Sequence, residues 1–166
     1  MMNNAQLRSH HMRLAGFALL LLLVMLGIFL MSARPGEDSA RMSDGFADTF
    51  LGRFFTRILP QLTDDVNMSL RKYAHMFEFF CLGISSFLFF FELFWVKEYR
   101  TVKTTILAVL WSFLYACSDE WHQTFVPERA GRWSDLRFDA VGFLFGIALL
   151  AFIEWMRKKR KDSAST

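Results

Sequence analysis

Residues that commonly build metal, redox or nucleic-acid sites are scarce or scattered in this sequence. It has two cysteines among 166 residues, Cys81 and Cys117, and both lie inside apolar stretches, where cysteine usually behaves as a small buried hydrophobe. They do not form a Cys-x-x-Cys pair, which excludes that zinc or redox pattern. The net charge of +3 comes from basic residues that separate apolar runs, so we expect no nucleic-acid partner.

What the sequence has in excess is apolar surface. Hydrophobic residues make up 54% of the chain, and 20 residues are phenylalanine, whereas soluble domains are about 45–50% apolar. A chain of this length cannot bury that excess in a core, because small domains have a high ratio of surface to volume. We therefore expect one all-α domain, a polytopic bundle of membrane helices whose outer surface is covered by lipid.

Four apolar runs are suited to crossing the ~30 Å of hydrocarbon, which takes about 20 helical residues. We predict spans at about 14–31, 73–96, 102–118 and 138–155. Together they give a transmembrane domain over 14–156, between an N-terminus of residues 1–13 and a basic tail of residues 157–166. A cleavable signal peptide is the alternative for the first run, but the apolar part of a signal is usually only ~7–15 residues.

The positions of Lys and Arg predict the orientation, because basic residues in short connections stay on the cytoplasmic side. The N-terminus, the connection from Lys97 to Lys103 and the tail from Arg157 to Lys161 share one side of a four-span topology. Basic residues of the other two loops are spread over longer segments and mixed with acids. We therefore predict that both termini are cytoplasmic and that both longer loops lie outside.

The first long loop contains a pattern typical of an amphipathic helix, with apolar residues at helical spacing from Phe46 to Leu59. Ser43 or Asp44 is expected to cap its start and Pro60 to mark its end. This helix either lies on the outer leaflet or packs on top of the bundle. The last residues, Asp162 to Thr166, are expected to be frayed.

Ionisable side chains in or beside the spans are candidates for function, because charges at membrane depth are costly. They gather at the start of the second span, the end of the third and the start of the fourth, which the predicted topology brings to one outer face. His75 and Glu78 share a helix face at a spacing of three, and Asp135 and Asp139 share one at a spacing of four. We predict one outward-facing polar site from these segments.

Other features favour a structural interpretation. Gly142 and Gly146 are spaced to let the fourth span approach a neighbouring helix closely. Glu92 and Glu154 lie near cytoplasmic ends, where each is expected to reach water or a lysine such as Lys97 or Lys158. Trp95, Tyr99 and Trp155 are expected to act as interfacial anchors on that side.

The polar segments resemble the VanZ-like family of bacterial membrane proteins, whose namesake is an accessory protein of glycopeptide resistance. The resemblance covers roughly residues 43–150 and rests on the block KYAHMFEFF from Lys72 to Phe80, with Leu82 and Gly83, and on the block SDEWHQTFVP from Ser118 to Pro127, followed by Arg129, Asp135, Asp139, Gly142 and Gly146. Glu128 stands where family members usually have glycine. That departure puts a glycine-dependent tight turn in doubt and is expected to place an extra acid against Arg129.

The resemblance implies about four membrane helices in the bacterial plasma membrane and a link to the cell envelope. Teicoplanin resistance is the attribute of the namesake, and the resemblance implies no known reaction and no cofactor. The first hypothesis is therefore a binding or accessory protein for a lipid-linked envelope precursor or a lipoglycopeptide, besides the surrounding membrane lipids. Its predicted ligand-binding residues are Lys72, Gln123, Arg129, Asp135 and Asp139.

Three alternatives remain open from the sequence. In a membrane enzyme, His75, Glu78 and Glu120 are the candidates for acid-base catalysis, although no nucleophile motif accompanies them. A metal site would use His75, Glu78 and Glu120 with His122 or Gln123, but zinc usually needs three or four converging ligands, so we expect no metal. In the structural alternative the same charges form a buried ion network that ties three helices together.

Overall fold

The computed structural model describes residues 3–58, 66–95, 100–129 and 131–164. Within these ranges it contains six α-helices and no strand: α1 (Asn4–Ser32), α2 (Gly36–Ala47), α3 (Phe50–Ile58), α4 (Val66–Leu93), α5 (Arg100–Gln123) and α6 (Leu136–Ala164). Helices α1, α4, α5 and α6 are long and apolar enough to cross a membrane. The predicted all-α bundle is therefore confirmed.

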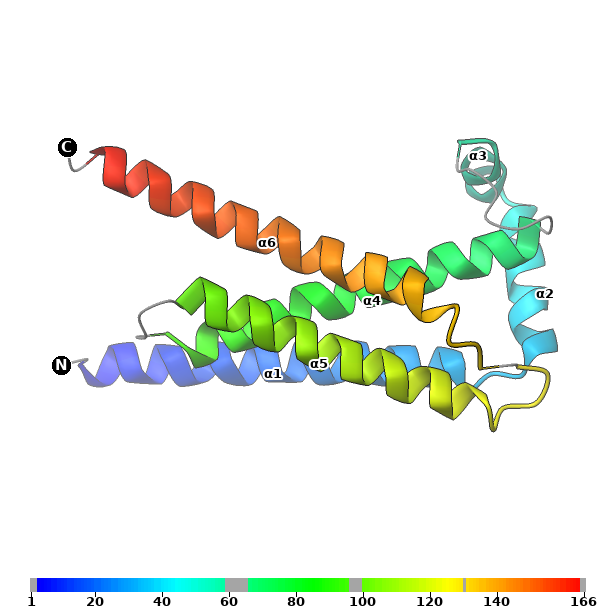
Figure 1. The fold of residues 1–166 in the computed structure, drawn as a ribbon, viewed down its shortest axis with the longest axis horizontal. Helices are drawn as coiled ribbons and strands as arrows, with labels where there is room; N and C mark the ends of the chain where they lie inside the picture. Colours follow the sequence, from blue (N-terminus) through cyan, green and yellow to red (C-terminus); the bar gives the residue numbers. More distant parts are fainter. Residues whose placement is uncertain (1–2, 59–65, 96–99, 130, 165–166) are drawn as a thin grey trace.

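The four long helices run along the longest dimension of the molecule, and α2 and α3 lie across one end (Figure 1). At this end, which we call the site end, α1 and α5 finish and α4 and α6 begin. The start of α1 and the end of α6 both lie at the opposite end. Large apolar side chains such as Leu22, Leu114 and Phe145 are more than half exposed along the bundle, as expected for a surface that faces lipid.

The amphipathic segment forms two helices, so the prediction of one helix is wrong. Thr49 breaks the segment: its hydroxyl donates to the carbonyl of Phe46 at 2.6 Å and accepts from the amide of Gly52 at 3.0 Å. A Thr side chain that satisfies the amide of the third residue after it starts a new helix as an N-cap. A Cβ on Gly52 would collide with the Phe46 carbonyl, so the corner between α2 and α3 requires glycine.

The predicted start of this segment is also wrong, because α2 begins at Gly36, after Pro35. Ser43 therefore sits inside α2, where its hydroxyl donates to the carbonyl of Ser39 at 3.1 Å. Phe54 and Ile58 on α3 are 51% and 62% exposed, which leaves an apolar face open. The predicted stop at Pro60 lies outside the described residues.

Helices α4 and α6 pack backbone against backbone. Gly142 lies against the carbonyl of Met76 and Gly146 against that of Phe80, and Gly83 on α4 lies against the carbonyl of Phe143. Any side chain at these positions would force the helices apart. The predicted role of Gly142 and Gly146 in helix packing is confirmed.

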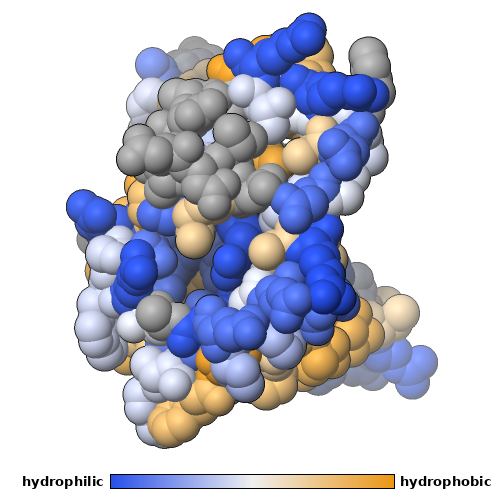
Figure 2. Space-filling view, turned by 90° about the vertical axis from the view of Figure 1, so that its right-hand side faces the viewer, coloured by the Kyte–Doolittle hydropathy of each residue, from blue (hydrophilic) through white to orange (hydrophobic). Residues whose placement is uncertain are grey.

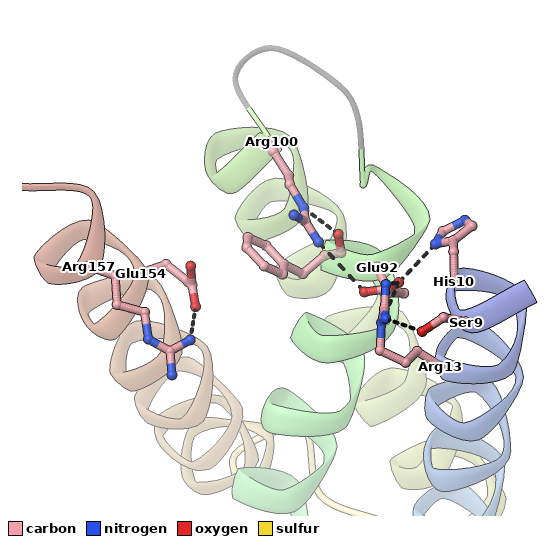
Figure 3. Close-up of polar contacts among 8 residues, drawn as sticks. Ser9, His10, Arg13, Glu92, Arg100, Glu154 and Arg157 are labelled. Carbon is pink, nitrogen blue, oxygen red and sulfur yellow. Dashed lines mark hydrogen bonds and ion pairs between the residues drawn. The ribbon is translucent and has the colours of Figure 1, made fainter. Parts of the chain in front are cut away.

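The opposite end of the bundle is tied together by Glu92, on α4 (Figure 3). Its Oε1 lies 2.8 Å from Nδ1 of His10 and 3.0 Å from Nε of Arg13, both on α1. Nη2 of Arg100, on α5, lies 3.8 Å from Oε2. Glu92 is 4% exposed, so the expectation that it reaches water is wrong, and the alternative partner, Lys97, lies outside the described residues.

Helix α6 extends well past its predicted span and includes the basic segment from Arg157 to Lys161. Lysine and arginine are good helix formers, so the helix continues beyond the apolar stretch. The hydroxyl of Ser163 donates to the carbonyl of Lys159 at 3.0 Å. The frayed tail predicted from Asp162 is therefore wrong as far as Ala164. Glu154 accepts from Arg157 at 2.6 Å and not from Lys158.

Candidate functional site

Hydrophilic side chains gather on the site end of the molecule (Figure 2). They include side chains from the first turns of α4, the last turns of α5, the start of α6 and the connection between α5 and α6. These are the segments that the topology was expected to bring together. The contacts among them separate side chains that hold the helices in place from side chains that face open space.

Two pairs join α4 to the start of α6. Nζ of Lys72 lies 3.6 Å from Oδ1 of Asp135 and 4.4 Å from the ring centre of Phe138. Nδ1 of His75 lies 3.5 Å from Oδ1 of Asp139. Asp139 is 1% exposed, and its second oxygen, Oδ2, has no hydrogen-bond partner among the described residues. The first pair joins opposite charges, and the second joins a histidine to an acid. One buried acceptor, Oδ2 of Asp139, is used by neither pair.

Asp119 holds the end of α1 against α5. Its Oδ2 accepts from the hydroxyl of Ser32 at 2.9 Å and from Nε2 of Gln123 at 2.8 Å. All three side chains are buried. Glu120, the next residue, points to the α5–α6 connection, where its Oε2 accepts from the amide of Arg132 at 2.8 Å. Asp119 and one oxygen of Glu120 are therefore engaged in holding the fold.

Arg129 caps the end of α1. Its Nε donates to the carbonyl of Arg34 and its Nη2 to the carbonyl of Met31, each at 3.1 Å. Carbonyls at the last turn of a helix have no partner within the helix, so a guanidinium there is stabilising. Nη1 makes one long contact of 3.5 Å to Oε1 of Gln123. Burial lowers the pKa of Arg129 from its usual value, and the Arg71 guanidinium adds to that effect.

The tight turn at Glu128 forms although the residue at this position is not glycine. Glu128 adopts a positive φ of 59°, which a non-glycine residue enters at a cost of about 1–2 kcal/mol. Its Oε2 accepts from the amide of Glu37 at 2.9 Å, and the preceding Pro127 carbonyl accepts from the amide of Gly36 at 3.1 Å. The acid thus caps the start of α2, and the expectation that it faces Arg129 is wrong.

A cavity of about 700 Å³ lies beneath α2 and α3. Its walls are mainly apolar and include Met42, Phe46, Phe55 and Phe77. Volumes of 300–1,000 Å³ are typical of pockets for small organic ligands. At one side the lining becomes polar and includes Arg71, His75, Glu78 and Arg129. Oε2 of Glu78 is buried and has no hydrogen-bond partner among the described residues.

A second cavity of about 50 Å³ adjoins the first, and most of the residues that line it are polar or charged. Three residues line both cavities, namely Arg71, His75 and Arg129. All eight residues predicted for the site line at least one of the two cavities; they are Lys72, His75, Glu78, Glu120, Gln123, Arg129, Asp135 and Asp139. The structure therefore brings them together, and their roles stay predictions.

Arg71 is the site residue that sequence reasoning missed. It is half-buried on α4, lines both cavities and forms no ion pair with another described residue. Lys72, the basic residue that the sequence pattern predicts for this part of the site, is paired with Asp135. A signal was available, because Arg71, His75 and Glu78 recur at spacings of four and three and so share one helix face.

Two other residues of the SDEWHQTFVP block, His122 and Ser118, lie apart from the cavities. The ring of His122 stacks on Phe29 with centroids 4.6 Å apart, and Ser118 is exposed, with its hydroxyl bonded to the carbonyl of Tyr115 at 2.7 Å. Neither residue lines a cavity. Among the described residues, no group of three His, Cys, Asp or Glu side chains is placed to share a metal ion.

The fold and the site together define a helical membrane protein with an apolar cavity that is polar at one side. A profile of the VanZ/LLP1 family matches residues 17–154. The chain therefore belongs to the VanZ/LLP1 family, as its polar blocks predicted. No curated protein and no solved structure matches the chain.

Proposed function

We propose that this protein crosses the bacterial plasma membrane four times and binds a phosphate-bearing lipid, or a lipid-linked envelope precursor, at the outer leaflet. In this role it is an accessory factor of the cell envelope, with no known enzymatic reaction assigned to it. The observation that carries the proposal is the meeting of a large apolar cavity and a small polar one at Arg71, His75 and Arg129.

The apolar cavity suits a hydrocarbon chain. Its lining from α2, α3 and α4 is rich in Met and Phe side chains, and burying such surface is favourable at roughly 25 cal/mol per Å². Helix α3 keeps an exposed apolar face beside this cavity, which supports placing α2 and α3 at the level of the lipid headgroups. A lipid that diffuses in the outer leaflet then reaches the cavity without changing its depth in the membrane.

The polar side suits a phosphate. Arg71 has no carboxylate partner among the described residues, and a guanidinium binds phosphate oxygens through two parallel hydrogen bonds. Arg129 adds positive charge, although two of its nitrogens are occupied by the carbonyls of Met31, in α1, and Arg34, just after α1. Arg71 is therefore the main contact to phosphate in this proposal, and Arg129 has a largely structural role.

The direct test is lipid binding by the purified full-length chain with Arg71→Gln. Native mass spectrometry titrated with a phospholipid measures the affinity, and Arg53→Gln, an exposed arginine on α3, is the matched control. Loss of a charge-assisted hydrogen bond is expected to weaken binding about tenfold. Equal affinity of all three proteins, or no retained lipid, would contradict the proposal. A lipoglycopeptide added as competitor tests the link to the namesake's resistance phenotype.

A further inference from the structure

We propose that the preferred ligand is a phospholipid whose small head joins the phosphate to a primary ammonium group, with the ammonium seated in the 50 Å³ cavity beside Asp139. This inference rests on the proposed function and adds the chemistry of the head. The phosphate stays between the two cavities at Arg71, and the hydrocarbon chain occupies the larger one.

The smaller cavity is lined by three acids and by three basic side chains, Arg71, Lys72 and Arg129, but among the described residues only one of these acids forms an ion pair with a basic side chain. Glu120, Asp135 and Asp139 line it, and of these Asp135 is paired with Lys72 and Glu120 uses one oxygen on a backbone amide. Among the described residues, Asp139 has one ion-pair partner, His75, whose Nδ1 lies 3.5 Å from Oδ1. A purely anionic head would bring more negative charge toward these carboxylates, whereas a cation at this point offsets them.

In this proposal the ligand donates a hydrogen bond to Oδ2 of Asp139. Asp139 is 1% exposed, it lines the smaller cavity, and its Oδ2 has no partner among the described residues. Buried acceptors in folded proteins almost always have a partner. A primary ammonium supplies three N–H donors and a positive charge, so it donates to Oδ2 and also gives Asp139 a cationic partner. A trimethylated ammonium has the charge but no N–H donor.

The size of the cavity limits the head. A water needs about 10–15 Å³ of such space, so about 50 Å³ admits a group of a few heavy atoms and excludes a sugar ring. An ammonium on a two-carbon arm fits this limit. The polar cavity therefore discriminates by size against glycosylated heads and by hydrogen bonding against methylated ones.

The test uses one phospholipid with fixed acyl chains and zero, one, two or three methyl groups on its nitrogen, together with the phosphoglycerol analogue. Binding to the unaltered full-length protein is measured by native mass spectrometry. We expect affinity to fall along the methylation series, with the trimethylated lipid about tenfold weaker than the primary amine. The phosphoglycerol lipid is expected to bind more weakly than the primary amine as well.

The matched variants are Asp139→Asn and Asp48→Asn. The first is expected to remove the preference for the primary amine while the Arg71-dependent binding persists; Asp48 is exposed and lines neither cavity, so its variant should keep the preference. If Asp139→Asn does not fold, the methylation series on the unaltered chain decides alone. Equal affinity across the series, or tighter binding of phosphoglycerol, overturns the inference and leaves the proposed function standing. No binding of any phospholipid overturns both.

Discussion

The hydroxyl of Ser32, the last residue of α1, donates to Asp119 of α5 across 2.9 Å, and both side chains are buried. With Arg129 bonded to the carbonyl of Met31, this contact fixes the end of α1 beside the larger cavity. The position of one cavity wall therefore depends on a hydrogen bond between residues 87 positions apart.

Replacing Ser32 with Ala is expected to destabilise the protein. Asp119 keeps the bond from Gln123 but loses one buried donor, which costs about 1–3 kcal/mol. The midpoint of thermal unfolding in detergent, followed by circular dichroism, measures the effect. Ser118→Ala is the control, because that hydroxyl is exposed and bonds within its own helix. A similar midpoint for both variants would show that the Ser32 contact contributes no stability.

Glu92→Gln is expected to be among the most destabilising single changes at the opposite end. The substitution leaves His10, Arg13 and Arg100 around a neutral amide, and breaking a buried charge pair costs about 3–5 kcal/mol. Partial exposure of Arg13, at 39%, reduces this to about 2–3 kcal/mol. Glu154→Gln removes one ion pair with an exposed arginine and should shift the unfolding midpoint little. The prediction fails if the two variants unfold alike.

Glu128→Ala and Glu128→Gly are expected to differ. Both lose the cap on the amide of Glu37, worth about 1 kcal/mol. Glycine also relieves the strain of the positive φ, by about 1–2 kcal/mol, so it should be near neutral while alanine destabilises. Unfolding midpoints of the two variants in one detergent test this. An alanine variant as stable as the glycine variant would show that the turn carries no strain.

The proposed orientation predicts which positions an impermeant thiol reagent reaches in intact cells. In a background without Cys81 and Cys117, a cysteine replacing the exposed Ser134 should be labelled, whereas one replacing Ser163 should be labelled only after the cells are permeabilised. Both positions are exposed in the fold, so labelling of each in lysed cells is the control. Labelling of the Ser163 position alone in intact cells would place the site on the cytoplasmic side.

The four long helices were predictable because apolar runs of spanning length are visible directly in the sequence. The meeting of the polar segments followed from the four-span topology. The break at Thr49 was harder to foresee, since the apolar spacing continues through it while capping and the close approach of Gly52 to Phe46 decide the corner. The burial of Glu92 depends on α1 lying beside it, which no local pattern encodes.

Within the site, the sequence pattern alone does not distinguish side chains that hold the helices together from side chains that are available to bind a ligand. Lys72 and Arg71 are neighbours in sequence, but they lie on different sides of the helix. Lys72 pairs with Asp135, whereas Arg71 lines both cavities. Arginine is typical of anion-binding sites, yet the nearest acceptors of Arg129 are the backbone carbonyls of Met31 and Arg34, at and just after the end of α1. Such assignments need the relative positions of helices that lie far apart in the chain.

The contact between α4 and α6 has a consequence for the biosynthesis of this protein. If the helices enter the membrane in chain order, His75 and Glu78 are inserted with α4 before the acids of α6 have been made. Asp139 meets His75 only when Gly142 and Gly146 of the last helix seat against α4. A ribosome-bound chain that ends before α6 therefore carries only the α4 side of the polar cavity, and the site for the proposed ligand is complete only after the final helix is in place.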